Sequence, residues 1–188
     1  MKLIVGLGNP GEEYENTRHN AGRNAVRAIQ RTADLPQFAE NKKFFSLISG
    51  GSIGKNKVIV ALPETMMNGS GKAVRAIVEM YKIKPADIMV VHDDADILFG
   101  AMKISFAKRA AGHRGVESVR RALKTDAFWR LRIGIQPSAK KHIPAMDLVL
   151  KKFSPKDSTM MKKLGKRAAA GIAVFIEQGG EAAMTEFN

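Results

Sequence analysis

Residues 3–32, LIVGLGNPGEEYENTRHNAGRNAVRAIQRT, contain the pattern that decides the fold. Residues 3–7 are apolar and predict a buried strand, which Gly8-Asn9-Pro10-Gly11 ends. Residues 20–32 then carry apolar side chains at helical spacing among arginine and glutamine, which predicts an amphipathic helix. A buried strand, a polar loop and an amphipathic helix in that order are typical of α/β proteins.

The rest of the chain continues this alternation without an internal repeat or a linker. Further strands are expected over residues 44–48, 58–62, 88–91, 101–106 and 128–135, with a turn at 49–54 between the first two. Helices are expected over residues 70–81, 115–124 and 154–178, the last as one helix or two. The sequence therefore predicts a single α/β domain over residues 1–188.

The composition supports one globular domain. The chain has 188 residues, 45% of them hydrophobic and 26% charged, which is enough for one well-buried core and too little for two ordinary domains. The absence of cysteine excludes a disulfide framework, a thiolate nucleophile and a cysteine-ligated metal. The first residues already form a strand pattern, and no apolar run approaches the roughly 20 residues of a membrane span. We therefore expect a soluble cytoplasmic protein.

The positive charge lies in the second half of the chain. The formal net charge is +13, and residues 101–188 hold 18 Lys and Arg against 7 Asp and Glu, whereas residues 1–100 hold 13 against 11. A field of one sign favours a polyanionic partner, nucleic acid first and an anionic membrane second. The alternative is a highly soluble protein with basic surface helices.

Three polar side chains stand where predicted strands end or helices begin. Asn9 follows the first strand, Asn68 lies between a strand and a helix, and Asp93 follows the strand over residues 88–91. In open α/β sheets, ligands bind beyond the carboxyl ends of the strands. We therefore expect these side chains to gather at one edge of the sheet.

A histidine and a carboxylate at this edge could activate water. His19 precedes the first helix, and its imidazole could take a proton from water if a carboxylate held its other nitrogen. The segment His92-Asp93-Asp94-Ala95-Asp96 offers that carboxylate. Alternatively, His19 caps the helix and the acidic residues form a solvated loop or a metal site. The sequence lacks a His-x-x-x-His pair and a tight carboxylate cage, so no metal is assigned.

Two other motifs favour structure over chemistry. Gly6-Leu7-Gly8-Asn9-Pro10-Gly11 has the spacing of a dinucleotide loop, but Pro10 and the three glutamates of residues 12–15 oppose phosphate binding. A turn that presents the Asn9 amide is the preferred interpretation, and no cofactor is expected. Ser70 lacks the Gly-x-Ser-x-Gly spacing of a nucleophile and is better placed to cap a helix. Water is therefore the expected nucleophile, with asparagine amides as substrate clamps.

Four segments together resemble the bacterial-type peptidyl-tRNA hydrolase family, and a fifth, Gly112-His113-Arg114-Gly115, matches in part. The four are Gly6-Leu7-Gly8-Asn9-Pro10-Gly11, Thr17-Arg18-His19-Asn20-Ala21-Gly22, Met67-Asn68-Gly69-Ser70-Gly71 and Val91-His92-Asp93-Asp94-Ala95-Asp96. The resemblance covers the whole domain. It implies a monomeric α/β domain with a twisted mixed β-sheet flanked by helices, which hydrolyses the ester between a peptide and the terminal ribose of tRNA without a cofactor or metal.

The resemblance also implies roles for individual residues. His19 matches the general base and Asp93 the carboxylate that orients it. Asn9 and Asn68 match side chains that hold the peptide and the tRNA end. Five further positions match the remaining parts of the site: Tyr14 and Met67 line it, His113 lies in a mobile loop over the cleft, and Lys103 and Arg132 contact tRNA phosphate.

Three departures from the family lie near the same loop. Arg114 stands where family members usually carry asparagine, residues 107–111 replace a glycine-rich stretch, and Ser105 replaces a basic residue. We expect Lys108, Arg109 and Arg114 to substitute phosphate contacts for neutral ones in binding the acceptor stem and 3′ end of peptidyl-tRNA. The alternative is a catalytically impaired RNA-binding relative with the same fold.

Overall fold

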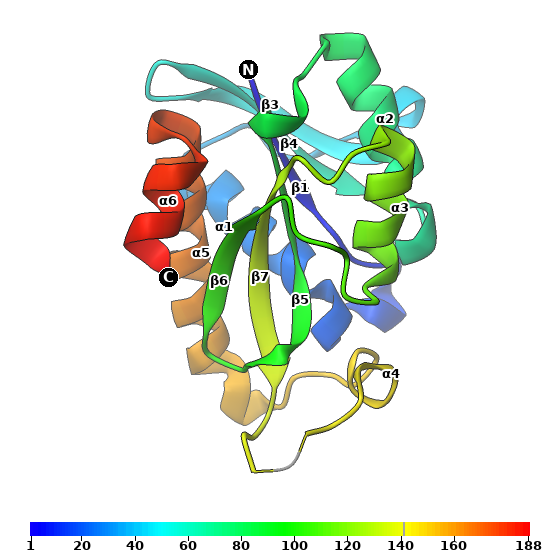
Figure 1. The fold of residues 1–188 in the computed structure, drawn as a ribbon, viewed down its shortest axis with the longest axis vertical. Coiled ribbons are helices and arrows are strands. Elements are labelled where there is room, and N and C mark those ends of the chain that lie inside the picture. Colours follow the sequence, from blue (N-terminus) through cyan, green and yellow to red (C-terminus); the bar gives the residue numbers. More distant parts are fainter. Residues whose placement is uncertain (141) are drawn as a thin grey trace.

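A seven-stranded mixed sheet runs through the computed structural model, which describes residues 1–140 and 142–188 (Figure 1). The strand order is β2-β3-β4-β1-β5-β7-β6, in which β4, β1, β5 and β7 are parallel and the other three strands pair antiparallel. The strands are β1 Lys2–Gly6, β2 Ala39–Asn41, β3 Ser46–Ile53, β4 Asn56–Pro63, β5 Ile88–Leu98, β6 Met102–Phe106 and β7 Trp129–Gln136. The predicted α/β class and mixed sheet are confirmed.

Helices cover both faces of this sheet. On one face α1 packs against α5, and α6 follows α5 to cover β6, whereas α2 and α3 pack together on the other face (Figure 1). The helices are α1 Ala21–Thr32, α2 Ser70–Tyr81, α3 Arg114–Leu123, α4 Ala145–Leu148, α5 Ser158–Gln178 and α6 Gly180–Phe187. Both ends of the chain therefore pack onto the same sheet. No helix in the described part of the chain is long and apolar enough to cross a membrane.

The central strands supply two cores, one on each face. In β1, Ile4 packs with the α1 and α5 side chains, whereas Leu3 and Val5 pack with those of α2 and α3. All three side chains are fully buried. Burial on both faces explains why the strand is a continuous apolar run, and each such side chain contributes about 1.5–3 kcal/mol to folding.

The main correction concerns β5, which runs to Leu98 and does not end at residue 91. Asp93 therefore lies within β5, whereas the sequence placed it after the end of the strand. The last residue of β1, Gly6, pairs with Val91, so the residues of β5 beyond Val91 pair with β7 alone. This loss of one neighbour opens space beside the strand, and polar residues can occupy it.

Residues 49–53 are also strand, not the predicted turn. They extend β3 and pair with β4 down to a tight turn at Gly54, which adopts φ +56°. Small polar residues and glycines fit here because this part of the sheet is largely exposed. The predicted helix over residues 154–178 begins at Ser158, after a capping box between Ser154 and Asp157. Ser70 does not cap a helix: it begins α2, and its hydroxyl donates to the Met67 carbonyl.

Candidate active site

A cleft of about 530 Å³ lies beyond the carboxyl end of β1, beside β5. Its walls come from Asn9, Tyr14 and His19 and from the segments 66–68, 93–96, 110–114 and 145–150. The cleft forms here because Gly22 lets the first turn of α1 cross the ends of β1 and β5. A Cβ at this position would overlap the carbonyl oxygen of Val91. The predicted gathering of Asn9, Asn68 and Asp93 at one edge of the sheet is confirmed.

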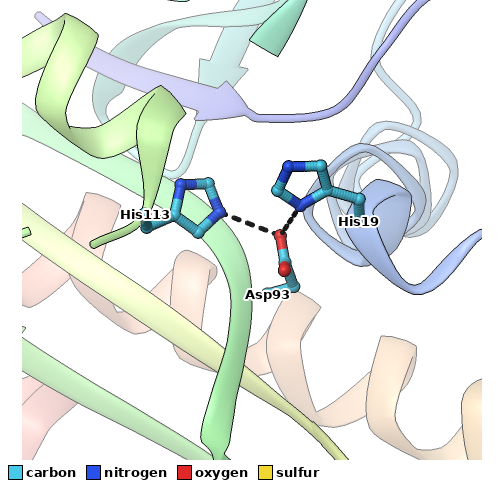
Figure 2. A group of neighbouring side chains, drawn as sticks. All are labelled: His19, Asp93 and His113. Carbon is cyan, nitrogen blue, oxygen red and sulfur yellow. Dashed lines mark hydrogen bonds and ion pairs between the residues drawn. The ribbon is translucent and has the colours of Figure 1, made fainter. Parts of the chain in front are cut away.

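Two imidazoles share one oxygen of Asp93 at the base of this cleft (Figure 2). His19 Nδ1 lies 2.8 Å from Asp93 Oδ1, and His113 Nε2 lies 2.9 Å from the same oxygen. His19 comes from the turn before α1, and His113 precedes α3, so the helices on opposite faces of the sheet bring them together. The predicted proximity of His19 and Asp93 is confirmed.

The hydrogen bonds define which ring nitrogens carry protons. His113 Nδ1 caps α3 by accepting from the backbone N–H groups of Gly115 and Val116 at 3.2 and 3.3 Å, so the proton of this ring is on Nε2. His19 donates from Nδ1 to the carboxylate, which leaves the lone pair on its Nε2. Among the residues that the structure describes, no group bonds to this Nε2. It is therefore available to accept a proton in the cleft.

The pKa of Asp93 is lowered despite its burial. Burial alone would raise this pKa, but the adjacent His113 and His19 imidazoles outweigh it and hold the pKa below the ordinary value of 3.8. The neighbouring His92 is also fully buried, and burial holds its pKa well below 6.5. Its Nδ1–H donates to the Asp93 carbonyl oxygen at 2.6 Å. The site thus contains the buried negative charge of Asp93 and a neutral histidine behind it.

Asn9 is held by a clamp that the sequence did not reveal. The Asn20 side chain accepts from the Asn9 N–H at 2.8 Å and donates to the Asn9 carbonyl at 2.9 Å. The Asn9 Oδ1 accepts from the Met67 N–H at 2.8 Å, which leaves the Nδ2 amide as a donor at the cleft wall. The signal for Asn20 was its position beside His19 at the start of a helix.

The predicted lining residues all reach the cleft, and an apolar rim adds to them. Tyr14, Met67, Asn68, His113 and Arg114 line it together with Asn9, His19 and Asp93. The rim, which the sequence analysis missed, consists of Met146, Leu150 and Met66, which are 81%, 59% and 49% exposed. The stretch at residues 145–150 after Pro144, apolar except for Asp147, was the available signal for Met146 and Leu150.

The predicted phosphate ligands lie outside the cleft lining, apart from Arg114. Lys103 of β6 is paired in register with Arg132 of β7, and Arg132 Nε donates to Asp94 Oδ2 at 2.7 Å. The Arg132 charge is therefore partly neutralised from within the protein. Lys108 and Arg109 are exposed in the loop over residues 107–113, whose Ala110, Ala111 and Gly112 do line the cleft.

The donor atoms of His19, Asp93 and His113 lie within 4.8 Å of one another, close enough to bind a divalent cation. Such binding would require both rings to give up the protons that they donate to Asp93. In the hydrogen-bonded state the carboxylate instead accepts from both imidazoles and orients them. That state suits the orientation of a base.

Comparisons with known proteins identify the family of this chain. The family model for peptidyl-tRNA hydrolase matches residues 3–188. The peptidyl-tRNA hydrolase of Desulfitobacterium hafniense is 35% identical over 189 residues, with full coverage of both chains. That of Aquifex aeolicus is 39% identical over 188 residues, which is all of this chain and 96% of the relative.

Solved structures give the same result. The crystal structure of peptidyl-tRNA hydrolase from Acinetobacter baumannii superposes with a TM-score of 0.89 at 30% identity, covering all of this chain and 94% of the other. An Arg119Gln variant of that enzyme gives 0.90 at 31% identity with the same coverage. Because sequence and fold both match from end to end, the chain belongs to the peptidyl-tRNA hydrolase family.

Proposed function

We propose that this protein hydrolyses the ester bond between peptide and tRNA in peptidyl-tRNA. The observation that carries the proposal is the His19–Asp93 pair, 2.8 Å apart, at the base of a cleft in a chain of this family. The pair leaves His19 Nε2 free to act as a base, and the chain contains no cysteine that could serve as a covalent nucleophile. In this proposal the attacking group is water, which His19 Nε2 activates.

In the proposed mechanism, His19 Nε2 removes a proton from water as the water oxygen bonds to the ester carbonyl carbon. Asp93 stabilises the imidazolium that forms and fixes its orientation. The bond from that carbon to the terminal ribose oxygen then breaks, and His19 returns the proton to the ribose oxygen. The products are a tRNA with a free ribose hydroxyl at its 3′ end and a peptide carboxylic acid, which releases its proton to solvent. General base catalysis of this kind contributes about 10²–10⁴-fold to the rate.

The two asparagines and the apolar rim suit a peptide joined to a nucleotide. The Nδ2 of Asn9 and the exposed amide of Asn68 can bond to carbonyl groups of the peptide and to the tRNA end. Tyr14 and Met67 line the wall beside them. The rim of Met66, Met146 and Leu150 offers apolar contact to peptide side chains of varied sequence.

In this proposal, the tRNA is held by cations of β6, β7, the loop over residues 107–113 and the start of α3. Lys103 and Arg132 contact phosphates of the acceptor stem, and Arg132 must exchange its contact with Asp94 for a phosphate contact. Lys108, Arg109 and Arg114 add contacts near the 3′ end from the loop and the start of α3. The protein acts as a monomer in the cytoplasm, without a metal or cofactor in the reaction.

A single-turnover assay tests the proposed function. An excess of enzyme is mixed with a model peptidyl-tRNA, and release of the peptide is followed together with tRNA binding. The hydrolase proposal predicts cleavage within the first turnover. Binding of the tRNA without ester cleavage, even at high enzyme concentration, would refute it and would indicate an RNA-binding relative.

A further inference from the structure

A second cavity, of about 760 Å³, lies between α1 and α5. Its walls are the α1 residues from Asn24 to Thr32 and the α5 residues from Ser158 to Lys166, and residues 152–155 close one end. We call this cavity the α1–α5 groove. The helices α1 and α5 lie on the face of the sheet opposite to α2 and α3 (Figure 1). None of the residues assigned above to the catalytic cleft lines the groove.

The lining of the groove is strongly cationic. It contains no aspartate or glutamate among residues 1–140 and 142–188. Within the same described residues, none of its cations forms an ion pair. The cations are Arg27, Arg31, Lys152, Lys162 and Lys166. Because like charges in one groove repel, an anionic occupant would relieve the repulsion.

The cations form two rows that face each other. Arg27 and Arg31 lie one turn apart on α1, and Lys162 and Lys166 lie one turn apart on α5, about 6 Å along each helix. Between the rows the helices come close together, since a Cβ on Gly165 would sit 3.7 Å from the Ala28 side chain. A narrow floor with a positive row on each side fits one extended polyanionic strand.

Hydrogen-bond donors complete this lining. Asn24, Ser154 and Ser158 lie beside the cations, and together with lysine and arginine they are the side chains that commonly contact phosphate oxygens. The larger apolar side chains of the groove, Phe153, Met161 and Leu164, are buried or half-buried. A helix from a protein partner would need exposed apolar anchors here. The observations therefore favour a phosphodiester backbone over an acidic protein segment.

A thin wall of two adjacent chain segments separates the groove from the catalytic cleft. Residues 17–19 run alongside residues 149–152, with the His19 N–H donating to the Val149 carbonyl and the Arg18 N–H to that of Lys151. Tyr14 and Val149 line the cleft, whereas Asn16 and Lys152 line the groove. Separate RNA segments can therefore occupy the cleft and the groove at the same time.

We propose that the α1–α5 groove is a second RNA-binding surface, which takes the phosphodiester backbone of an RNA segment other than the acceptor end held in the cleft. This inference goes beyond the proposed hydrolysis and does not require it. The segment belongs either to a distant part of the same tRNA or to a second RNA molecule.

The test uses the double variant Lys162→Glu/Lys166→Glu with a fluorescent single-stranded RNA of twelve nucleotides that lacks the CCA end. The matched control is Lys55→Glu/Lys57→Glu, which changes the charge equally. The control site is far from the groove. Gly54, which is next to Lys55, lies against Glu177, and Glu177 is about 22 Å further along α5 than Lys162. We expect the groove variant to bind about tenfold more weakly at low salt, and the slope of log K against log salt to fall by about 1.4. The control should leave both values unchanged.

Competition identifies where the RNA binds. A saturating acceptor-stem minihelix should leave the twelve-nucleotide RNA bound. If full-length tRNA displaces the twelve-nucleotide RNA, the groove binds a distant part of the same tRNA that occupies the cleft. Full displacement by the minihelix, equal weakening in both double variants, or tighter binding of an acidic peptide than of RNA would each overturn the proposal. Hydrolysis of a short peptidyl ester is measured in parallel. If the wild type did not hydrolyse this ester, that result would refute the proposed function and not the second RNA-binding surface.

Discussion

His113 donates its Nε2 proton to Asp93 Oδ1 over 2.9 Å while its Nδ1 caps α3. The ring therefore joins the start of a helix to the carboxylate that orients His19. Because both nitrogens form hydrogen bonds, the orientation of the His113 imidazole is defined. His113, which the family resemblance places in a loop over the cleft, therefore also contacts the carboxylate directly.

Substitutions at His113 should separate its two roles. His113→Ala removes both the cap and the contact with Asp93, whereas His113→Ser restores a good cap but is too short to reach the carboxylate. We expect His113→Ala to lose about 1 kcal/mol of stability more than His113→Ser in thermal unfolding. Both variants should lose about tenfold in kcat, the scale of one hydrogen bond to a charged group. If serine recovered kcat together with stability, the contact with Asp93 would have no functional role.

His92 should make the protein less stable in mild acid. Burial holds its pKa well below 6.5 in the folded state, so the unfolded chain binds one more proton once the pH falls below that value. Stability from this group is fully present above about pH 6.5 and decreases as the pH falls, by at most about 1.4 kcal/mol per pH unit.

The variant His92→Asn keeps a donor for the Asp93 carbonyl but cannot titrate. Urea unfolding of both proteins between pH 7 and pH 5 measures the difference. We expect the wild type to lose stability more steeply than the variant over this range. Parallel curves would show that His92 titrates normally in the folded protein.

The loop over residues 107–113 contains two strained alanines. Ala107 and Ala111 have φ of 51° and 48°, in the left-handed region where a side chain costs about 1–2 kcal/mol. The family's glycine-rich stretch would avoid that cost. We expect Ala107→Gly/Ala111→Gly to stabilise the fold by about 1 kcal/mol, because relief of strain exceeds the added flexibility of the unfolded chain.

Ala33→Gly is the control for this prediction, because Ala33 has φ of −95° and gains no relief. It should destabilise the protein by about 0.5–1 kcal/mol. Denaturant midpoints of the three proteins give the comparison. A loss of stability in the loop variant equal to that of the control would show that the two alanines are not strained.

Arg114 should contribute to tRNA binding more than to the chemical step. It is exposed at the start of α3 and lines the cleft where family members usually carry asparagine. Arg114→Asn should raise KM for peptidyl-tRNA and reduce the salt slope by about 1, with kcat little changed. Lys124→Asn at the other end of α3 is the control, since asparagine tolerates its left-handed φ of 55°. A rise in kcat in Arg114→Asn would mean that arginine hinders catalysis.

Local patterns in the sequence predicted the central elements well. The β1 and α1 segments are recognisable because β1 is buried on both faces and α1 on one, so burial leaves a clear pattern. The length of β5 was not predictable, because the strand continues beyond Val91 through its pairing with β7, a distant part of the chain. The helix α6 was also missed. It packs through Gly180 against Trp129, a contact between distant parts of the chain.

The same distinction applies to the site. Asn9, His19 and Asp93 could be grouped because strand ends meet at one edge of a sheet and because the motifs resemble a family. The Asn20 clamp and the pairing of Arg132 with Asp94 could not be predicted, because each is decided by side-chain geometry after folding. Local periodicity contains no information about such contacts.

The most direct test of the central claim is the single-turnover rate of His19→Ala on peptidyl-tRNA, measured together with its affinity for the tRNA. Loss of the base should lower the rate of peptide release by about 10²–10⁴-fold. The affinity should stay within about threefold of the wild type, because phosphate contacts elsewhere dominate binding. Peptide release by His19→Ala at the wild-type rate would contradict the proposal that His19 and Asp93 activate water.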